Sequence, residues 1–241
     1  MRVIAITTTP YEKPMPQLPE RFGTFCKVIP FELVENVPNI GLVPKMQKVY
    51  DWFLQEDILC YVHEDVTCHE PNWHERVLAE FTDPRVAVVG FGGATGIGVD
   101  DIYKTRYEIS QLQRIGYASN QRDWEIHGTR ETGAKDVAVV DGFFMAVRRE
   151  FLREIGGFRW FSHRFHCYDT ALCLMAHRKG WKVRMVGVEC THHGASFSAS
   201  PEYKKWCHEN GTTMEREHEE PHRWMYDWDV ARDLLPFRVS Q

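Results

Sequence analysis

Two acidic side chains follow an apolar segment early in the chain. Residues 58–62 are a compact apolar run that leads directly into His63, Glu64 and Asp65. Carboxylate oxygens are the ligands that Mg²⁺ and Mn²⁺ prefer, and a diphosphate would fill the remaining coordination positions. We therefore expect Asp65, with Glu64 beside it, to hold a divalent cation that neutralises a phosphate leaving group. The alternative is a pair of solvated turn residues, which is how most acidic pairs after strands behave.

A third carboxylate, Asp169, lies at the start of a predicted helix over residues 168–179, with His166 just before it. A carboxylate in the first turn of a helix is well placed to face a cleft, and it could take the proton of an attacking hydroxyl as a general base. The plainer interpretation is that Asp169 only caps the helix.

Two histidines, His192 and His193, follow a predicted strand and precede Gly194. Imidazole is an acceptable ligand for Mn²⁺ and a better one for zinc, so His192 is a candidate metal ligand. The chain has 12 histidines, so such a pair also arises easily by chance.

Two further positions carry weaker signals. Asp141 ends a predicted strand and precedes Gly142, whose lack of a side chain permits close approach of a ligand to the backbone. Lys45 begins the first long predicted helix and could contact a nucleotide or its phosphates, although a solvated helix lysine is the default.

The elements that must position these residues alternate between strands and helices. Apolar periodicity predicts strands over residues 2–8, 25–31, 58–62, 86–91, 137–140, 143–147 and 182–188, and helices over 44–55, 71–81, 149–155 and 168–179. This alternation indicates a three-layer α/β/α fold with a mostly parallel central sheet. The candidate residues then share the carboxyl edge of that sheet, where open α/β sheets bind ligands. We expect residues 94–135, which are polar and weakly periodic, to cover the substrate rather than to join the core.

The composition fits one large domain. The chain has 241 residues, 43% of them hydrophobic, and we expect a domain over residues 1–200 and a helical or mobile tail over residues 201–241 that packs on it. Lys and Arg total 29 against 34 Asp and Glu, a net charge of 29 − 34 = −5, which disfavours nonspecific nucleic-acid binding.

The compartment follows from the cysteines and from the start of the chain. Seven scattered cysteines without a CxxC pair indicate neither a disulfide framework nor a thiolate zinc site. The first residues lack the pattern of a signal peptide, and no stretch approaches the roughly 18 apolar residues of a membrane span. We therefore expect a cytoplasmic protein with no membrane span.

Four segments together resemble family 2 glycosyltransferases of the GT-A fold, and especially the short branch associated with streptomycin biosynthesis. They are YVHEDV at residues 61–66, VVDGFFMAVRREFLREIGGF at 139–158, FHCYDTALC at 165–173 and THHG at 191–194. The resemblance covers most of the chain, and the order and spacing of the four segments are more specific than any one of them.

The resemblance implies a nucleoside-diphosphate-sugar donor, a metal at the DxD-like position occupied here by Glu64 and Asp65, and inversion at the anomeric carbon. Asp169 falls where the family keeps its base, and Asp141 with Gly142 falls on the segment that lines the donor sugar and acceptor. His192 falls near the histidine that completes the metal shell. The remaining donor-binding candidates implied by the resemblance are Thr7, Thr8, Lys45 and His166.

The expected activity is thus transfer of a hexosyl or pentosyl group, with Mn²⁺ or Mg²⁺, to an acceptor hydroxyl on a saccharide, lipid-linked sugar, small metabolite or modified nucleobase. Alternatives are a nucleotidyltransferase on a similar fold and a noncatalytic nucleotide- or sugar-binding relative. A zinc hydrolase is a weaker alternative, because no HExxH motif occurs and its candidate ligands lack compact spacing. Those ligands would be His63, His69, His74, His166, His192 and His193.

Overall fold

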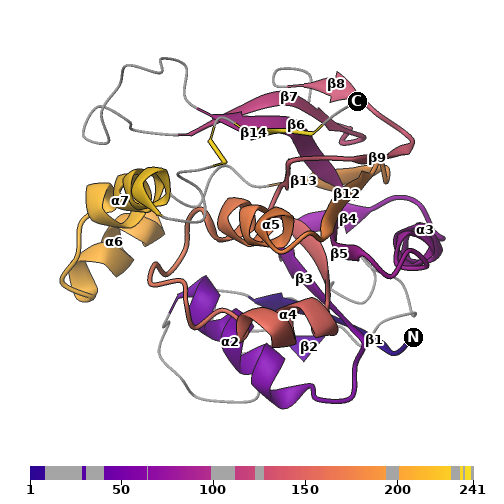
Figure 1. Ribbon diagram of the computed structural model, residues 1–241. Helices are drawn as coiled ribbons and strands as arrows, with labels where there is room; N and C mark the ends of the chain where they lie inside the picture. The colour runs from indigo at the N-terminus through magenta and orange to yellow at the C-terminus, as the bar shows by residue number, and fades with distance from the viewer. Residues whose placement is uncertain are drawn as a thin grey trace.

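A seven-stranded mixed sheet forms the centre of the protein in a computed structural model (Figure 1). The structure describes residues 1–8, 29–30, 41–63, 65–98, 112–122, 128–193, 201–228, 234–235 and 237–239. The strand order is β2 (Ile29–Pro30), β1 (Val3–Thr8), β3 (Ile58–His63), β11 (Phe144–Arg148), β5 (Val86–Gly90), β12 (Lys182–Val186) and β9 (Ala134–Asp136). The pairings give β2, β1, β3, β5 and β12 one direction, whereas β11 and β9 run opposite to them.

Helices cover both faces of this sheet because its strands are apolar on both sides. Along β3, Leu59 and Tyr61 join one core cluster, while Ile58 and Cys60 join the other. This alternation is the two-residue period of a strand buried on both faces. The first cluster packs against α2 (Leu42–Trp52), α4 (Arg149–Ile155) and α5 (Tyr168–Arg178), and the second against α3 (Trp73–Glu80).

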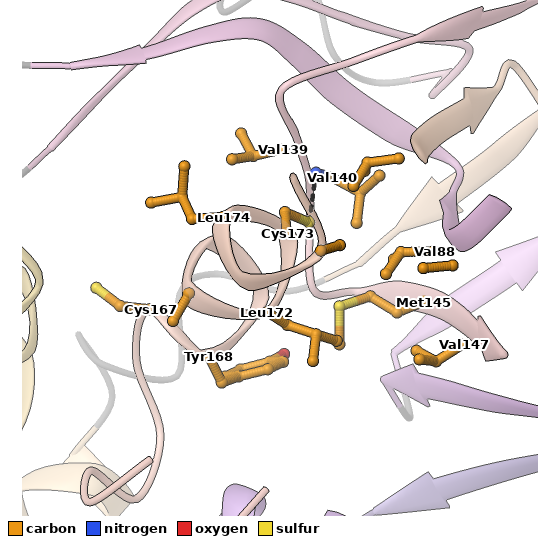
Figure 2. Packing of buried hydrophobic residues seen from close by; sticks show 14 of the residues in the cluster. Val88, Val139, Val140, Met145, Val147, Cys167, Tyr168, Leu172, Cys173 and Leu174 are labelled. Atoms are coloured by element: carbon orange, nitrogen blue, oxygen red, sulfur yellow. Dashed lines mark hydrogen bonds between the residues drawn. The ribbon is translucent and has the colours of Figure 1, made fainter. Parts of the chain in front are cut away.

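Figure 2 shows how α5 is seated in the first cluster. Leu172 and Cys173 lie beside Val140 and Met145 from the strands below. The amide N–H of Val140 also donates to the sulfur of Cys173 at 3.5 Å. Apolar side chains fill both faces of the sheet, so the polar side chains that could form a site lie at the ends of these strands and helices.

A second, smaller sheet lies above the end of the central one (Figure 1). Its strands are β10 (Val139–Val140), β6 (Gly92–Gly98), β7 (Gln113–Ser119) and β8 (Thr129–Arg130), with β14 (Phe237–Arg238) paired to β6. A two-stranded ribbon pairs β13 (Cys190–His192) with β4 (Val66–Cys68). Ala94, Ile97 and Ala118 of this second sheet are buried in the first core cluster. The expectation that residues 94–135 stay outside the core is therefore wrong for these positions.

Two helices follow the ribbon: α6 (Pro201–Glu209) and α7 (Met214–Asp227). The hydroxyl of Thr213 caps α7 by accepting the N–H of Arg216 at 3.1 Å. An aromatic stack holds α7 against the loop after α4. Trp228 stacks on Trp160 with ring centroids 5.1 Å apart and on Trp224 at 5.0 Å.

The three-layer α/β/α expectation is confirmed, and most predicted elements are present within a few residues. The first long helix ends at Trp52 rather than at Gln55, because the chain leaves the helical conformation at Phe53. The helix Arg149–Ile155 has the predicted bounds and is followed by two glycines, Gly156 and Gly157, which adopt the left-handed backbone with φ of 78° and 74°. Within the part of the chain that the structure describes, no helix has both the length and the apolar composition needed to cross a bilayer.

Replacing Phe144 by alanine should lower the free energy of unfolding by about 3–5 kcal/mol, because it leaves a cavity in the second core cluster. Phe144 is fully buried, stacked on Phe91 at 3.6 Å between ring centroids and in edge contact with Trp73. Urea denaturation followed by circular dichroism measures the change. The matched control, Leu54→Ala, removes a side chain that is 65% exposed and should change stability by less than about 0.5 kcal/mol.

Candidate metal and acid–base site

Three side chains that are distant in sequence meet at the end of β3. His63 is the last residue of β3, Asp65 precedes β4, and His192 ends β13, which pairs with β4. Each offers one ligand atom, and these atoms all lie within 4.8 Å of one another. The imidazole Nε2 of His192 is 3.2 Å from Oδ1 of Asp65. The ribbon therefore brings a histidine from late in the chain to the carboxylate beside the central sheet.

The charges of this trio follow from burial and from the Asp65–His192 pair. Burial, followed by the positive charge of His192, lowers the pKa of His63. Burial opposes ionisation of Asp65 and protonation of His192, but their mutual hydrogen bond and attraction outweigh it. The pKa of Asp65 is lowered, and that of His192 is raised. These shifts favour a charged Asp65–His192 pair and an uncharged imidazole at His63.

The trio fits a divalent first-row metal ion by the chemistry of its donors. Two imidazoles and one carboxylate are a ligand set for ions such as Mn²⁺, Fe²⁺ or Zn²⁺, whereas Mg²⁺ prefers oxygen ligands alone. Phe143 closes one side, with its ring stacked on that of His192 at 5.0 Å between centroids. Three protein ligands leave positions for a substrate.

A short turn between β10 and β11 carries Asp141, Gly142 and Phe143 to the same edge. The backbone N–H of His63 donates to the carbonyl of Phe143 at 2.8 Å. At the other end of the turn, the N–H of Asp141 donates to the carbonyl of Gly92 at 2.9 Å. The turn is thus fixed between the strand that carries the metal ligand and the second sheet.

One guanidinium joins two carboxylates at this turn. Arg114 of β7 donates from Nη1 to Asp141 at 2.6 Å and from Nη2 to Asp169 at 2.7 Å. Burial opposes the ionisation of Asp141, but Arg114 and then His192 outweigh it and lower its pKa. Burial also opposes protonation of Arg114, but the two carboxylates raise its pKa. The phenol of Tyr117 lies 3.4 Å from the same oxygen of Asp141.

Asp169 accepts three hydrogen bonds. Its Oδ2 accepts from Arg114 and from the N–H of Gly142 at 2.9 Å, and its Oδ1 accepts the N–H of Thr170 at 2.7 Å. A carboxylate offers about four lone-pair directions. Asp169 is mostly buried, with 9% of its side chain exposed, and its partners among the described residues leave one acceptor direction on Oδ1 for a further donor.

Gly142 is in tight contact with the residue before Asp169. A Cβ on Gly142 would lie 2.3 Å from the hydroxyl oxygen of Tyr168, which is closer than real Cβ contacts come. That hydroxyl lies 3.2 Å from the carbonyl oxygen of Gly142 and 3.0 Å from Nε2 of His63. The absence of a side chain at Gly142 is therefore a packing requirement of the turn against α5.

The structure brings four of the candidate residues into this arrangement: Asp65, Asp141, Asp169 and His192, with Gly142 between them. Thr8 pairs with His63 in the parallel register of β1 and β3, and Thr7 pairs with Val62, so both lie at the same end of the sheet. Glu64 lies outside the described residues.

Two other candidates are Lys45 and His166. Lys45 is buried in the first turns of α2, with 4% of its surface exposed, so it is not the solvated helix lysine that its position suggests. His166 packs against the tail, with its ring centroid 4.7 Å from that of His218 in α7. Of the six histidines considered as zinc ligands, the described residues place His63 and His192 together with Asp65.

Two residues of the arrangement, Arg114 and Tyr168, were not among the candidates, and a third, His63, was considered only as a zinc ligand. His63 precedes the two acids in the segment YVHEDV, and its place in that motif was the available signal. Arg114 lies in a segment that carries no motif, and Tyr168 has no sequence feature that distinguishes it from a core aromatic. Only their contacts reveal them.

The sequence matches a family model described as a glycosyltransferase-like family over residues 44–226, which is more than half of the chain. No curated protein matches.

Several solved structures share the fold at low sequence identity. The protein A197 from STIV is 16% identical with a TM-score of 0.50, over 80% of this chain and 85% of that one. GalNAc-T7 with UDP, GalNAc and Mn²⁺ is 12% identical with a TM-score of 0.52, over 86% of this chain and 47% of that one, so this chain spans about half of its length. The mannosyltransferase PcManGT from Pyrobaculum calidifontis, in complex with GDP-Man and Mn²⁺, is 12% identical with a TM-score of 0.51, over 96% of this chain and 72% of that one. The fold is thus the GT-A fold of glycosyltransferases.

The contact of His166 with the tail predicts an acid-sensitive stability. Burial, then the positive charge of His218, lowers the pKa of His166 to about 3. An unfolded histidine binds a proton near pH 6.5, so between pH 6.5 and about 3 the unfolded chain holds a proton that the folded chain excludes. The contribution of His166 to stability is therefore lost as the pH falls through this range.

Chemical denaturation of His166→Gln at several pH values should show a weaker loss of stability on acidification than the wild type. The control, His208→Gln, changes an exposed histidine of α6 and should follow the wild-type curve. Parallel curves for His166→Gln and the wild type would contradict the assignment.

Proposed function

The chain belongs to the glycosyltransferase-like family, and on that premise we propose that it transfers a sugar from a nucleoside-diphosphate sugar to an acceptor hydroxyl. The observation that carries the proposal is the meeting of two groups of side chains at one edge of the sheet. His63, Asp65 and His192 form a metal-ligand set, and Asp141 and Asp169 are joined by Arg114 next to it.

His63, Asp65 and His192 would hold the metal, and Mn²⁺ suits their nitrogen donors better than Mg²⁺ does. When bound, the ion supplies positive charge that stabilises the diphosphate leaving group. His63 extends the ligand set expected from the sequence, in which Asp65 and His192 were the candidates. Thr7, Thr8 and Lys45 remain candidates for the nucleotide, because β1 ends beside His63 and α2 packs over that face of the sheet.

Asp169 is the proposed general base. The acceptor oxygen attacks the anomeric carbon as the bond from that carbon to the diphosphate oxygen breaks, and the hydroxyl proton passes to Asp169. Its Oδ1 has the remaining acceptor direction, so the acceptor hydroxyl would donate there while Arg114, Gly142 and Thr170 hold the carboxylate in place. Direct attack opposite the leaving group inverts the anomeric configuration.

Asp141 is proposed to contact the donor sugar. It is held from one side by Arg114 and lies on the turn whose carbonyl at Phe143 pairs with His63. A carboxylate in this place can accept hydrogen bonds from sugar hydroxyls. We also propose that the chain belongs to the short branch of the family associated with streptomycin biosynthesis, and that it acts in the cytoplasm.

Screening identifies the donor. Thermal-shift measurements of the full chain with nucleoside-diphosphate sugars, with and without Mn²⁺, should give one or a few donors that raise the melting temperature only when Mn²⁺ is present, by ligand linkage. Release of pyrophosphate from a nucleoside triphosphate would instead favour a nucleotidyltransferase. Binding without transfer to any acceptor or to water would favour a noncatalytic relative.

Asp169→Asn should reduce transfer by about 10²–10⁴-fold, because an amide cannot take the hydroxyl proton. The amide oxygen can still accept hydrogen bonds from Gly142 and Arg114, so donor binding should persist. Initial rates with the identified donor and calorimetric titration of the same donor separate the two effects. Transfer at the wild-type rate would contradict the assignment of the base.

Asp65→Asn should abolish the Mn²⁺-dependent part of donor binding while leaving the fold intact, because the trio loses its only carboxylate. Calorimetric titration of Mn²⁺ alone and of donor with Mn²⁺ measures this. Asp51→Asn is the matched control: it removes a carboxylate that pairs with Arg159 on the surface of α2. Unchanged Mn²⁺ affinity in Asp65→Asn would refute the metal site.

A further inference from the structure

The hydroxyl of Tyr168 bridges the metal-ligand set and the turn that carries Asp141. It lies 3.0 Å from Nε2 of His63 and 3.2 Å from the carbonyl oxygen of Gly142. Tyr168 is buried and is the first residue of α5, next to Asp169. The phenol therefore contacts the metal ligand His63 directly, and the backbone of α5 joins it to the neighbouring residue, the proposed base Asp169.

The direction of the hydrogen bonds follows from counting protons. A phenol has one proton to donate, and a carbonyl oxygen can only accept. If Tyr168 donated to His63, its oxygen would face the carbonyl oxygen of Gly142 at 3.2 Å with no proton between them. Donation to Gly142 removes this repulsion and leaves a lone pair on the phenol oxygen for an N–H from His63. The proton of His63 therefore belongs on Nε2.

We propose that Tyr168 is a positioning residue that holds His63 in the Nε2–H form, so that Nδ1 keeps its lone pair for a metal ion. Metal-binding histidines in general donate their second ring N–H to a neighbouring acceptor, which fixes the ring and its tautomer. Here the acceptor is a phenol rather than a carboxylate or a backbone carbonyl. The metal-binding half of this inference rests on the proposed function, whereas the tautomer does not.

The same contacts couple the metal ligand to the proposed base. Gly142 offers two polar backbone groups, and consecutive residues of α5 bind both: its carbonyl accepts from Tyr168, and its N–H donates to Asp169. A displacement of α5 would therefore move the partner of His63 and the carboxylate of Asp169 together. The close approach of Tyr168 to Gly142, which leaves no room for a Cβ, makes this coupling rigid.

The tautomer is measured first in the wild type without metal. Two-bond ¹H–¹⁵N correlation spectra of the histidine rings, assigned with a His63→Gln variant, should show His63 as a neutral ring protonated on Nε2. A ring of His63 protonated on Nδ1 would overturn the proposal without any variant of Tyr168 having to fold.

The variant Tyr168→Phe removes only the hydroxyl. Its spectra should show His63 as a mixture of tautomers, and calorimetric titration with Mn²⁺ alone should show an affinity about 10–100-fold lower than that of the wild type. The matched control is Tyr61→Phe, which removes a buried phenol that donates to the backbone carbonyl of Met46 at 3.3 Å. It should leave the tautomer of His63 and the affinity for Mn²⁺ unchanged.

The outcomes separate the two proposals. An unchanged His63 spectrum in Tyr168→Phe, or the same change in Tyr61→Phe, would show that Tyr168 does not set the tautomer. A change confined to Tyr168→Phe supports the positioning role, even in a protein that transfers no sugar. If the protein shows this change but transfers no sugar, the proposed function fails, whereas the assignment of the Nε2–H tautomer to His63 stands.

Discussion

Two carboxylates that approach the same point in a protein repel each other unless a cation lies between them. Asp141 and Asp169 come from different elements, and the guanidinium of Arg114 is that cation. Its planar fork gives one donor to each acid, which a lysine ammonium would not do with the same geometry. The second sheet supplies Arg114 from β7, so this sheet is part of the acid–base site as well as part of the core. The acid–base site at the edge of the central sheet therefore forms only when the second sheet is also folded.

Backbone contacts extend this arrangement to the metal-ligand set. Backbone hydrogen bonds join the turn between β10 and β11 to Gly92 on one side and to His63 on the other. They fix the position of the Asp141 carboxylate relative to the imidazole of His63. β11 runs antiparallel between β3 and β5, so the turn that precedes it lies at the end where β3 finishes. Neighbouring strands thus bring together residues that are some 80 positions apart in sequence.

Much of this could be predicted from the sequence, because apolar periodicity places strand ends and strand ends share an edge. Asp65, Asp141, Asp169 and His192 all follow or precede regular elements, and the structure groups them. Arg114 could not be found in this way, since its role depends on the pairing of β7 with β6 and not on any local pattern. β6 is rich in glycine and β7 is mostly exposed along its first half, so both give a weak apolar period even though Ala94 and Ala118 are buried. The contact of His166 with the tail could not be predicted either: its ring lies against that of His218 in α7, and Cys167, between His166 and α5, has a left-handed φ of 63°.

The indole stack that holds α7 against the loop after α4 has a spectroscopic consequence. The ring planes of Trp160 and Trp228 are nearly parallel, with 5° between them, and Trp224 also stacks on Trp228, at 21°. Chromophores held this close exchange excitation energy and give coupled bands in circular dichroism, and detachment of the helix would remove the coupling between Trp228 and Trp160. The near-ultraviolet circular dichroism of the unlabelled protein should therefore report whether α7 is packed against the loop after α4.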